Sequence, residues 1–190
     1  MHENLSLLQN FLSSNYYKDP IPHIIIDNAL PSNLYKNLME TVPNDLITNK
    51  SLNNMRGDIF ANQLVGLEKY KLFCDFLNYN CSNEFYSEFI KIFEKDLDVL
   101  YPGLVSNTKD LINKKKTHNF GLSGFKKKDT MTCLASYSYN TPVTKSSEVI
   151  GPHLDHYDKI FFGLFYLRQF EDHLENKGGD LVIYKWKKKY

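Results

Sequence analysis

Two stretches decide the fold class of this sequence: MTCLASYSY at residues 131–139 and IFFGLFYL at residues 160–167. In the first stretch, alternate residues from Met131 to Tyr139 are apolar or aromatic, which predicts a strand with one buried face. The second stretch is apolar throughout, which predicts a strand buried on both faces. A further strand is predicted at residues 181–186, after a turn at Gly178-Gly179.

The residues before 131 have a different pattern. Apolar residues recur with helical spacing at residues 5–17, 67–79 and 83–100, and a further helix opens at Leu30-Pro31-Ser32 and ends at Pro43. Residues 20–27 predict a strand, while the polar residues 48–63 and 106–130 predict loops. Helices therefore come first and strands second, an order that favours an α+β fold with helices supporting a sheet.

One segment combines several groups that can bind a metal: GPHLDHYD at residues 151–158. His153 and Asp155 are two residues apart, so at the end of a strand their side chains project to the same face. A neutral imidazole and a carboxylate are two of the three ligands of the 2-His-1-carboxylate site, which leaves positions open on non-haem Fe(II). A buried strand is predicted directly after the segment, which favours a metal site over a surface turn.

These features together resemble the 2-oxoglutarate/Fe(II)-dependent dioxygenase superfamily, in its prolyl-4-hydroxylase-like branch. The N-terminal stretch IPHIIIDNALP at residues 21–31 is also similar to the strand-then-helix entry of this branch. The resemblance covers most of the chain and is most specific over residues 131–186. It rests on Tyr139-Asn140, on Gly151-Pro152-His153-Leu154-Asp155, on Phe165-Tyr166-Leu167-Arg168 and on Gly178-Gly179-Asp180-Leu181-Val182-Ile183-Tyr184.

The resemblance implies a fold of N-terminal helices packed on a double-stranded β-helix of the jelly-roll or cupin type. Residues 1–190 would then form a single domain. Within it, residues 1–105 would supply a strand and the supporting helices, and residues 131–190 the first half of the β-helix. We expect the barrel to be incomplete because about two strands are predicted after the HxD motif, where the family has about six.

The resemblance also implies the site. His153 and Asp155 would bind Fe(II), and Tyr139 (or Tyr137) and Tyr166 would contact the co-substrate 2-oxoglutarate, with ascorbate as an accessory reductant. The reaction would hydroxylate a protein side chain, such as proline, or a small molecule, while dioxygen converts 2-oxoglutarate to succinate. The alternative for the tyrosines is that each is a core aromatic with a hydrogen-bonded hydroxyl.

The chain departs from the family pattern after Asp155. The family has a second His several tens of residues after the HxD motif, but the only His beyond His156 is His173, which comes too early. The family also has an Arg for the distal carboxylate of 2-oxoglutarate; here Arg168 or Lys185 are the candidates. We therefore expect a C-terminally truncated fragment of an oxygenase, with weak metal binding and no turnover of its own.

Two other functions remain open on the sequence. A cupin-like or jelly-roll module that only binds a partner would need neither the second His nor the Arg. A dinuclear metallo-hydrolase with the motif HxHxDH is a weaker alternative, because that motif needs His at position 151, where this chain has Gly151.

Composition limits the partners. The 190 residues include 23 basic and 22 acidic side chains, a net charge of +1, which does not favour nucleic acid as a partner. No run of 18 apolar residues predicts a membrane span, and residues 1–4 do not resemble a signal peptide, so we expect a cytoplasmic protein without a membrane partner. Three cysteines without CxxC spacing predict reduced thiols rather than a disulfide framework.

Overall fold

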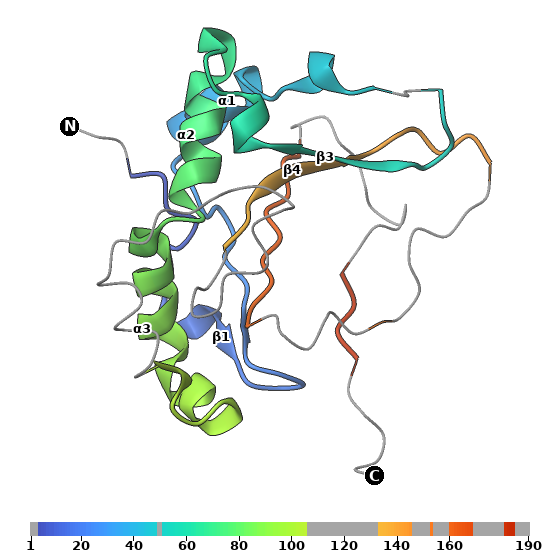
Figure 1. The fold of residues 1–190 in the computed structure, drawn as a ribbon. Helices are drawn as coiled ribbons and strands as arrows, with labels where there is room; N and C mark the ends of the chain where they lie inside the picture. Colours follow the sequence, from blue (N-terminus) through green and yellow to red (C-terminus); the bar gives the residue numbers. More distant parts are fainter. Residues whose placement is uncertain are drawn as a thin grey trace.

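The computed structural model describes residues 4–48, 51–105, 133–145, 153, 160–168 and 181–184. These residues form a mixed α+β fold of three α-helices and two small antiparallel sheets (Figure 1), so the predicted class is confirmed. They do not form a closed barrel. The elements in chain order are η1 (Ser13–Asn15), β1 (Tyr16–Tyr17), β2 (His23–Ile24), α1 (Ser32–Glu40), η2 (Asn44–Leu46), β3 (Arg56–Phe60), η3 (Ala61–Gln63), η4 (Glu68–Tyr70), α2 (Lys71–Tyr79), α3 (Asn83–Leu100) and β4 (Ser136–Asn140).

The three α-helices follow the apolar spacing of the sequence. The longest, α3, begins after Ser82, whose hydroxyl oxygen accepts a hydrogen bond from the backbone N–H of Phe85 at 3.2 Å. This bond satisfies one of the free donors at the helix start. The predicted helix at residues 83–100 is confirmed in full, and α1 and α2 confirm most of the helices predicted between Ser32 and Pro43 and at residues 67–79.

The predicted helix at residues 5–17 is wrong. These residues form turns, η1 and β1 instead, because their polar groups bond to the corner between α2 and α3. The backbone N–H of Leu7 donates to Asn80 Oδ1 at 2.9 Å, and Asn80 Nδ2 donates to the Leu5 carbonyl at 2.8 Å. The buried Ser6 hydroxyl donates to Glu88 on α3. Tertiary hydrogen bonds therefore replace the bonds within a helix.

The predicted loop at residues 48–63 contains β3, which is a second correction. This strand pairs antiparallel with β4, and Gly57 lies opposite Tyr139 and Ile59 opposite Tyr137. The predicted strand at residues 131–139 is thus present as β4, from Ser136 to Asn140. Because β3 has only five residues, its alternation is too short to stand out within the polar stretch around it.

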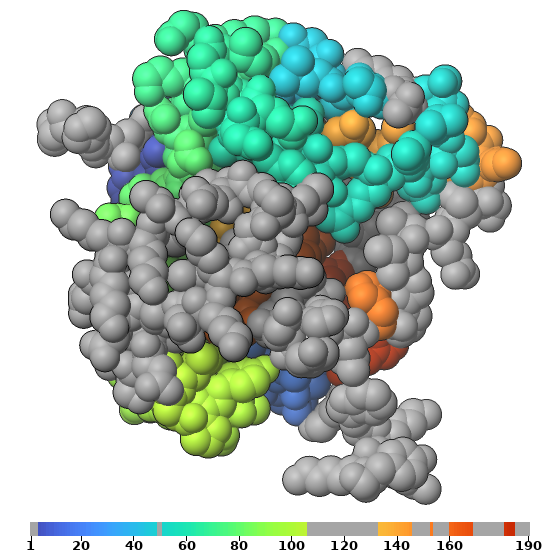
Figure 2. Space-filling model, in the orientation of Figure 1, coloured from blue at the N-terminus to red at the C-terminus, as the bar shows by residue number. Residues whose placement is uncertain are grey.

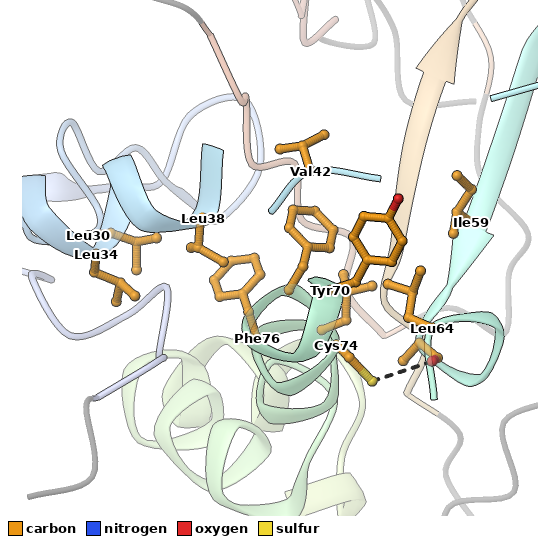
Figure 3. Packing of buried hydrophobic residues seen from close by; sticks show 12 residues of the cluster. Leu30, Leu34, Leu38, Val42, Ile59, Leu64, Tyr70, Cys74 and Phe76 are labelled. Atoms are coloured by element: carbon orange, nitrogen blue, oxygen red, sulfur yellow. Dashed lines mark hydrogen bonds between the residues drawn. The ribbon is translucent and has the colours of Figure 1, made fainter. Parts of the chain in front are cut away.

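The main hydrophobic core lies between α1, α2 and the β3–β4 ribbon, as Figure 3 shows. We call it the helical core. Phe73 of α2 is at its centre with 1% of its surface exposed, and Tyr137 of β4 meets Phe73 edge-on at 5.7 Å between ring centroids. The buried members are Leu30, Leu34, Leu38, Val42, Ile59, Ala61, Leu64, Tyr70, Phe73, Cys74, Phe76 and Leu77.

A second cluster forms around α3. Phe89 and Phe93, one turn apart, pack with their rings tilted and the centroids 4.8 Å apart, and Tyr16 of β1 packs on Phe93 at 5.6 Å. The N-terminal strands are held against α3 by this contact, and Figure 2 shows the blue N-terminal residues beside the yellow-green end of α3. The buried members are Tyr86, Phe89, Ile90, Phe93, Leu97 and Val105.

Residues 160–168 connect the two clusters. Phe161 packs on Phe89 with ring centroids 4.2 Å apart, while Phe165 packs on Phe76 of the helical core at 5.6 Å. In Figure 1 this segment is the orange trace that runs from beside β1 towards the β3–β4 ribbon. The segment therefore runs along the helices from the cluster around α3 to the helical core.

The prediction that residues 160–167 are buried on both faces is wrong. The odd-numbered side chains pack on the helices, but Phe162 is 60% exposed and Leu164 is 50% exposed. Alternation with a period of two means that the segment is extended and has one covered face. Residues 181–184 are all exposed and are not assigned to a strand; the rest of the strand predicted at 181–186 lies outside the described residues.

Candidate functional site

The uncovered face of residues 160–168 carries two of the residues expected to bind a co-substrate. We call Phe162, Leu164, Tyr166 and Arg168 the outer face of this segment. The Arg168 guanidinium carbon lies 5.3 Å from the centroid of the Tyr166 ring, a cation–π distance. Tyr166 is 47% exposed. The structure therefore places a hydroxyl donor and a guanidinium side by side, both open to solvent.

Helix α1 holds the end of the segment in place. The Tyr35 hydroxyl donates a hydrogen bond to the carbonyl oxygen of Arg168 at 2.5 Å. The same ring meets Phe165 edge-on, with the planes at 89° and the centroids 6.2 Å apart. Because Phe165 and Arg168 flank Tyr166 in the chain, these two contacts fix the backbone from which Tyr166 projects.

Tyr139 is oriented differently. It lies on the face of β4 that packs towards the helical core, next to Tyr137 at 6.2 Å between ring centroids. The Tyr137 hydroxyl donates to Asn44 Oδ1 at 2.9 Å, and burial raises the pKa of Tyr137. Both rings are half-buried. This placement supports the alternative in which Tyr137 and Tyr139 are packing residues, and it separates them from the exposed Tyr166.

The other face of the β3–β4 ribbon carries a polar cluster. Asp58 Oδ1 accepts hydrogen bonds from Arg56 Nη2 at 3.3 Å, from Ser136 Oγ at 3.4 Å and from Ser138 Oγ. These side chains alternate with Ile59 and Tyr137, so they point away from the helical core. Arg56 therefore lies on the face of the ribbon opposite the helical core.

Sequence reasoning missed this polar cluster because residues 48–63 were expected to form a loop. The spacing of Arg56 and Asp58 is that of one strand face, and Ser136 and Ser138 have the same spacing on β4. The two pairs become neighbours only through the antiparallel register, which no local pattern predicts.

The predicted metal ligands can be placed only in part. His153 is exposed, while Asp155 lies outside the described residues. In the ranges that the structure covers, there is no group of three or more His, Cys, Asp or Glu side chains that could hold a metal ion. An imidazole and a carboxylate are donor types that Fe(II) accepts, so His153 and Asp155 fit the metal by chemistry. Lys185 and His173 also lie outside the described residues.

The cysteines do not offer a second reactive centre. All three are free thiols, as their spacing predicted. Burial raises the pKa of Cys81 to about 12 and that of Cys133 to about 11. Because the thiolate is the nucleophilic form, the raised pKa values disfavour reaction of both groups near neutral pH.

Comparison with protein-family models, with curated proteins and with solved structures finds no significant match to this chain. Within the part of the chain described here, every helix is too short or too polar to cross a membrane. The functional assignment therefore depends on the residues and their arrangement.

Proposed function

We propose that the chain is an oxygenase scaffold of the non-haem Fe(II)/2-oxoglutarate type, with helices covering one side of a partial double-stranded β-helix. The observation that carries the proposal is the outer face of residues 160–168. This segment follows the HxD motif at the place where the family has a strand, and it turns Tyr166 and Arg168 away from the helices. Helices that cover one face of this segment leave its other face available for a site, as the proposal needs.

Each residue has a distinct role in this proposal. His153 and Asp155 hold Fe(II), which when bound supplies the oxidising chemistry that activates dioxygen and hydroxylates the substrate. Arg168 pairs its guanidinium with a carboxylate of 2-oxoglutarate, since a planar fork of donors suits a carboxylate. The Tyr166 hydroxyl donates a hydrogen bond to the same molecule. Tyr35 is a positioning residue, because it acts through the backbone of Arg168.

Arg56, in the polar cluster on β3–β4, is the other arginine that could pair with the co-substrate carboxylate. The Arg56 side chain is 52% exposed and its guanidinium shares Asp58 with two serine hydroxyls. An Arg whose fork is partly occupied by a carboxylate binds an added anion less tightly than one whose fork is open. We therefore assign the co-substrate carboxylate to Arg168 rather than to Arg56.

The chain supplies two ligands of the expected three, so we propose that it binds Fe(II) weakly and does not turn over. The test is incubation with Fe(II), 2-oxoglutarate and ascorbate, followed by measurement of succinate. We expect no succinate above the level of the His153→Ala variant. Robust succinate formation would show that the ligand set is complete and would overturn the expected inactivity.

Co-substrate binding gives a separate test, which does not need turnover. Calorimetric titration of 2-oxoglutarate into the Fe(II)-loaded chain without oxygen should show binding that the double variant Tyr166→Phe/Arg168→Gln weakens about tenfold, as expected for loss of a charge-assisted contact. The control Lys36→Gln, an exposed side chain on α1, should bind as the unmodified chain does.

The leading alternative is a non-catalytic binding module of the cupin type. It is favoured by the same titration if 2-oxoglutarate fails to bind the unmodified chain with and without Fe(II). Binding of a pair of zinc ions in place of iron would instead favour the metallo-hydrolase.

A further inference from the structure

A groove lies between α3 and the N-terminal segment. It has a volume of about 540 Å³ and separates the N-terminal segment from the helix. Ligand sites of proteins span roughly 300–1,000 Å³, so the groove has the size of a small-molecule site. Its lining consists of Phe11, Ser13, Tyr16, Lys18, Lys91, Ile92, Lys95 and Asp96.

The two lysines that α3 contributes to the groove lie on a different face of the helix from Phe89, on which Phe161 packs. Phe161 packs on Phe89, and Lys91 follows Phe89 by two residues, which turns it roughly 200° around the helix. Lys95 is one further turn along, on the same face as Lys91. The described residues that line the groove do not include any of residues 160–168.

The charges in the groove do not balance. Lys18, Lys91 and Lys95 bring three ammonium groups, and Asp96 is the one carboxylate among the lining residues. The Asp96 carboxylate already accepts a hydrogen bond from the Tyr16 hydroxyl. In the portion of the chain with described structure, none of the three lysines has an ion-pair or hydrogen-bond partner.

The spacing of Lys91 and Lys95 also favours an anion in the groove. They are four residues apart on α3, where two like charges destabilise a helix slightly. An anion between them would relieve the repulsion and would gain two charge-assisted contacts. Lys18, immediately after β1, faces them across the groove and supplies a third.

The floor of the groove is apolar. The side chains of Phe11 and Ile92 are half-buried there, and the Tyr16 ring is fixed by its contact with Phe93. An inorganic anion gains no binding free energy from an apolar floor. A flat apolar group does, because both the group and the floor are removed from water when it binds. We propose that this groove binds an organic anion in which an aromatic ring carries a phosphate monoester or a similar dianionic group.

Phenyl phosphate is the probe for the test, with inorganic phosphate and phenol as partial ligands. Calorimetric titration into the unmodified chain should give a dissociation constant below about 1 mM for phenyl phosphate, and binding at least about tenfold weaker for each partial ligand. The variant Lys91→Gln/Lys95→Gln should weaken phenyl phosphate binding by about tenfold or more.

The matched control is Lys36→Gln/Lys71→Gln, which removes two exposed lysines of α1 and α2 and should leave binding unchanged. Circular dichroism should show the same helix content in both variants. The proposal is overturned if phenyl phosphate does not bind below about 1 mM, if inorganic phosphate or phenol binds equally well, or if both double variants lose the same affinity. Because no metal is added, failure of this test leaves the oxygenase proposal unaffected.

Discussion

The Tyr139 ring lies against the backbone of Gly57 across the β3–β4 pair. A Cβ atom built on Gly57 would be 2.4 Å from both Cζ and Oη of Tyr139, far inside van der Waals contact. Glycine is thus required at position 57 for the ring to cover the strand, as when an aromatic side chain shields a strand glycine. Tyr139 lies on the same face of β4 as Tyr137, the face that packs towards the helical core.

Gly57→Ala should destabilise the protein, because the Tyr139 ring has to leave its place to admit a methyl group. We expect a loss of about 1–3 kcal/mol in the free energy of unfolding, measured by urea denaturation. Gly163→Ala is the control, since a Cβ there meets nothing within 4 Å, and it should change stability by less than about 0.5 kcal/mol.

The clash can be separated from a backbone effect by a double-mutant cycle. In the Tyr139→Ala background, Gly57→Ala should cost less by about 1 kcal/mol or more, because the obstructing ring is gone. Equal costs in the two backgrounds would mean that the ring is not what requires glycine at this position.

Tyr35→Phe should loosen the end of residues 160–168. The variant keeps the ring that meets Phe165 but removes the hydrogen bond to the Arg168 carbonyl, at a cost of about 0.5–1.5 kcal/mol. Hydrogen–deuterium exchange should become faster in peptides covering residues 165–168 and remain unchanged in α3. Tyr17→Phe, at an exposed tyrosine of β1, is the control; if both variants accelerate exchange equally, Tyr35 does not position this segment.

The Asp45 carboxylate should make stability depend on pH in acid. A hydrogen bond from the Tyr70 hydroxyl, and then one from Lys69 at 2.9 Å, lower the pKa of Asp45 to about 2 from its ordinary value of 3.8. A lowered carboxyl pKa in the folded state stabilises it above about pH 4, and this contribution disappears as the pH falls through about 2.

Asp45→Asn should therefore lose stability near neutral pH and depend less on pH between about 4 and 2 than the unmodified chain. The measurement is the urea midpoint at a series of pH values. Tyr70→Phe keeps the buried ring but removes the hydrogen bond that lowers the Asp45 pKa most. It should therefore reduce the pH dependence of stability more than Lys69→Gln does. The reverse order of these two variants would contradict the assigned causes. Added salt should reduce the effect, because Asp45 is exposed.

The parts of the fold that the sequence predicted are those with a local cause. The apolar stripe of α3, from Phe85 to Leu97, repeats over several turns and needs no partner to be recognised. The N-terminal segment had a similar but shorter stripe, and there bonds from Ser6 to Glu88 and from Leu7 to Asn80 prevailed over helix formation. Short patterns lose to tertiary contacts more readily than long ones do.

The same distinction between local and tertiary causes applies to the residues of the candidate site. The sequence pointed to Tyr166 and Arg168, and the structure brings them together on one face because alternate residues of an extended segment point the same way. It did not predict Arg56 and Asp58, whose neighbours on β4 are set by strand register. It also could not separate Tyr139 from Tyr166, since burial of one side of a strand depends on which helices cover it.

The central claim, that the HxD motif holds a metal, is tested most directly by Fe(II) binding to four variants of one segment. His153→Ala and Asp155→Ala remove the proposed ligands, while His156→Ala and Asp158→Ala remove the same chemical groups a few residues away. Titration of Fe(II) without oxygen should show that each of the first two variants weakens binding by about tenfold or more, and that each of the last two stays within about twofold. Equal losses in all four variants, or none in the first two, would contradict the claim.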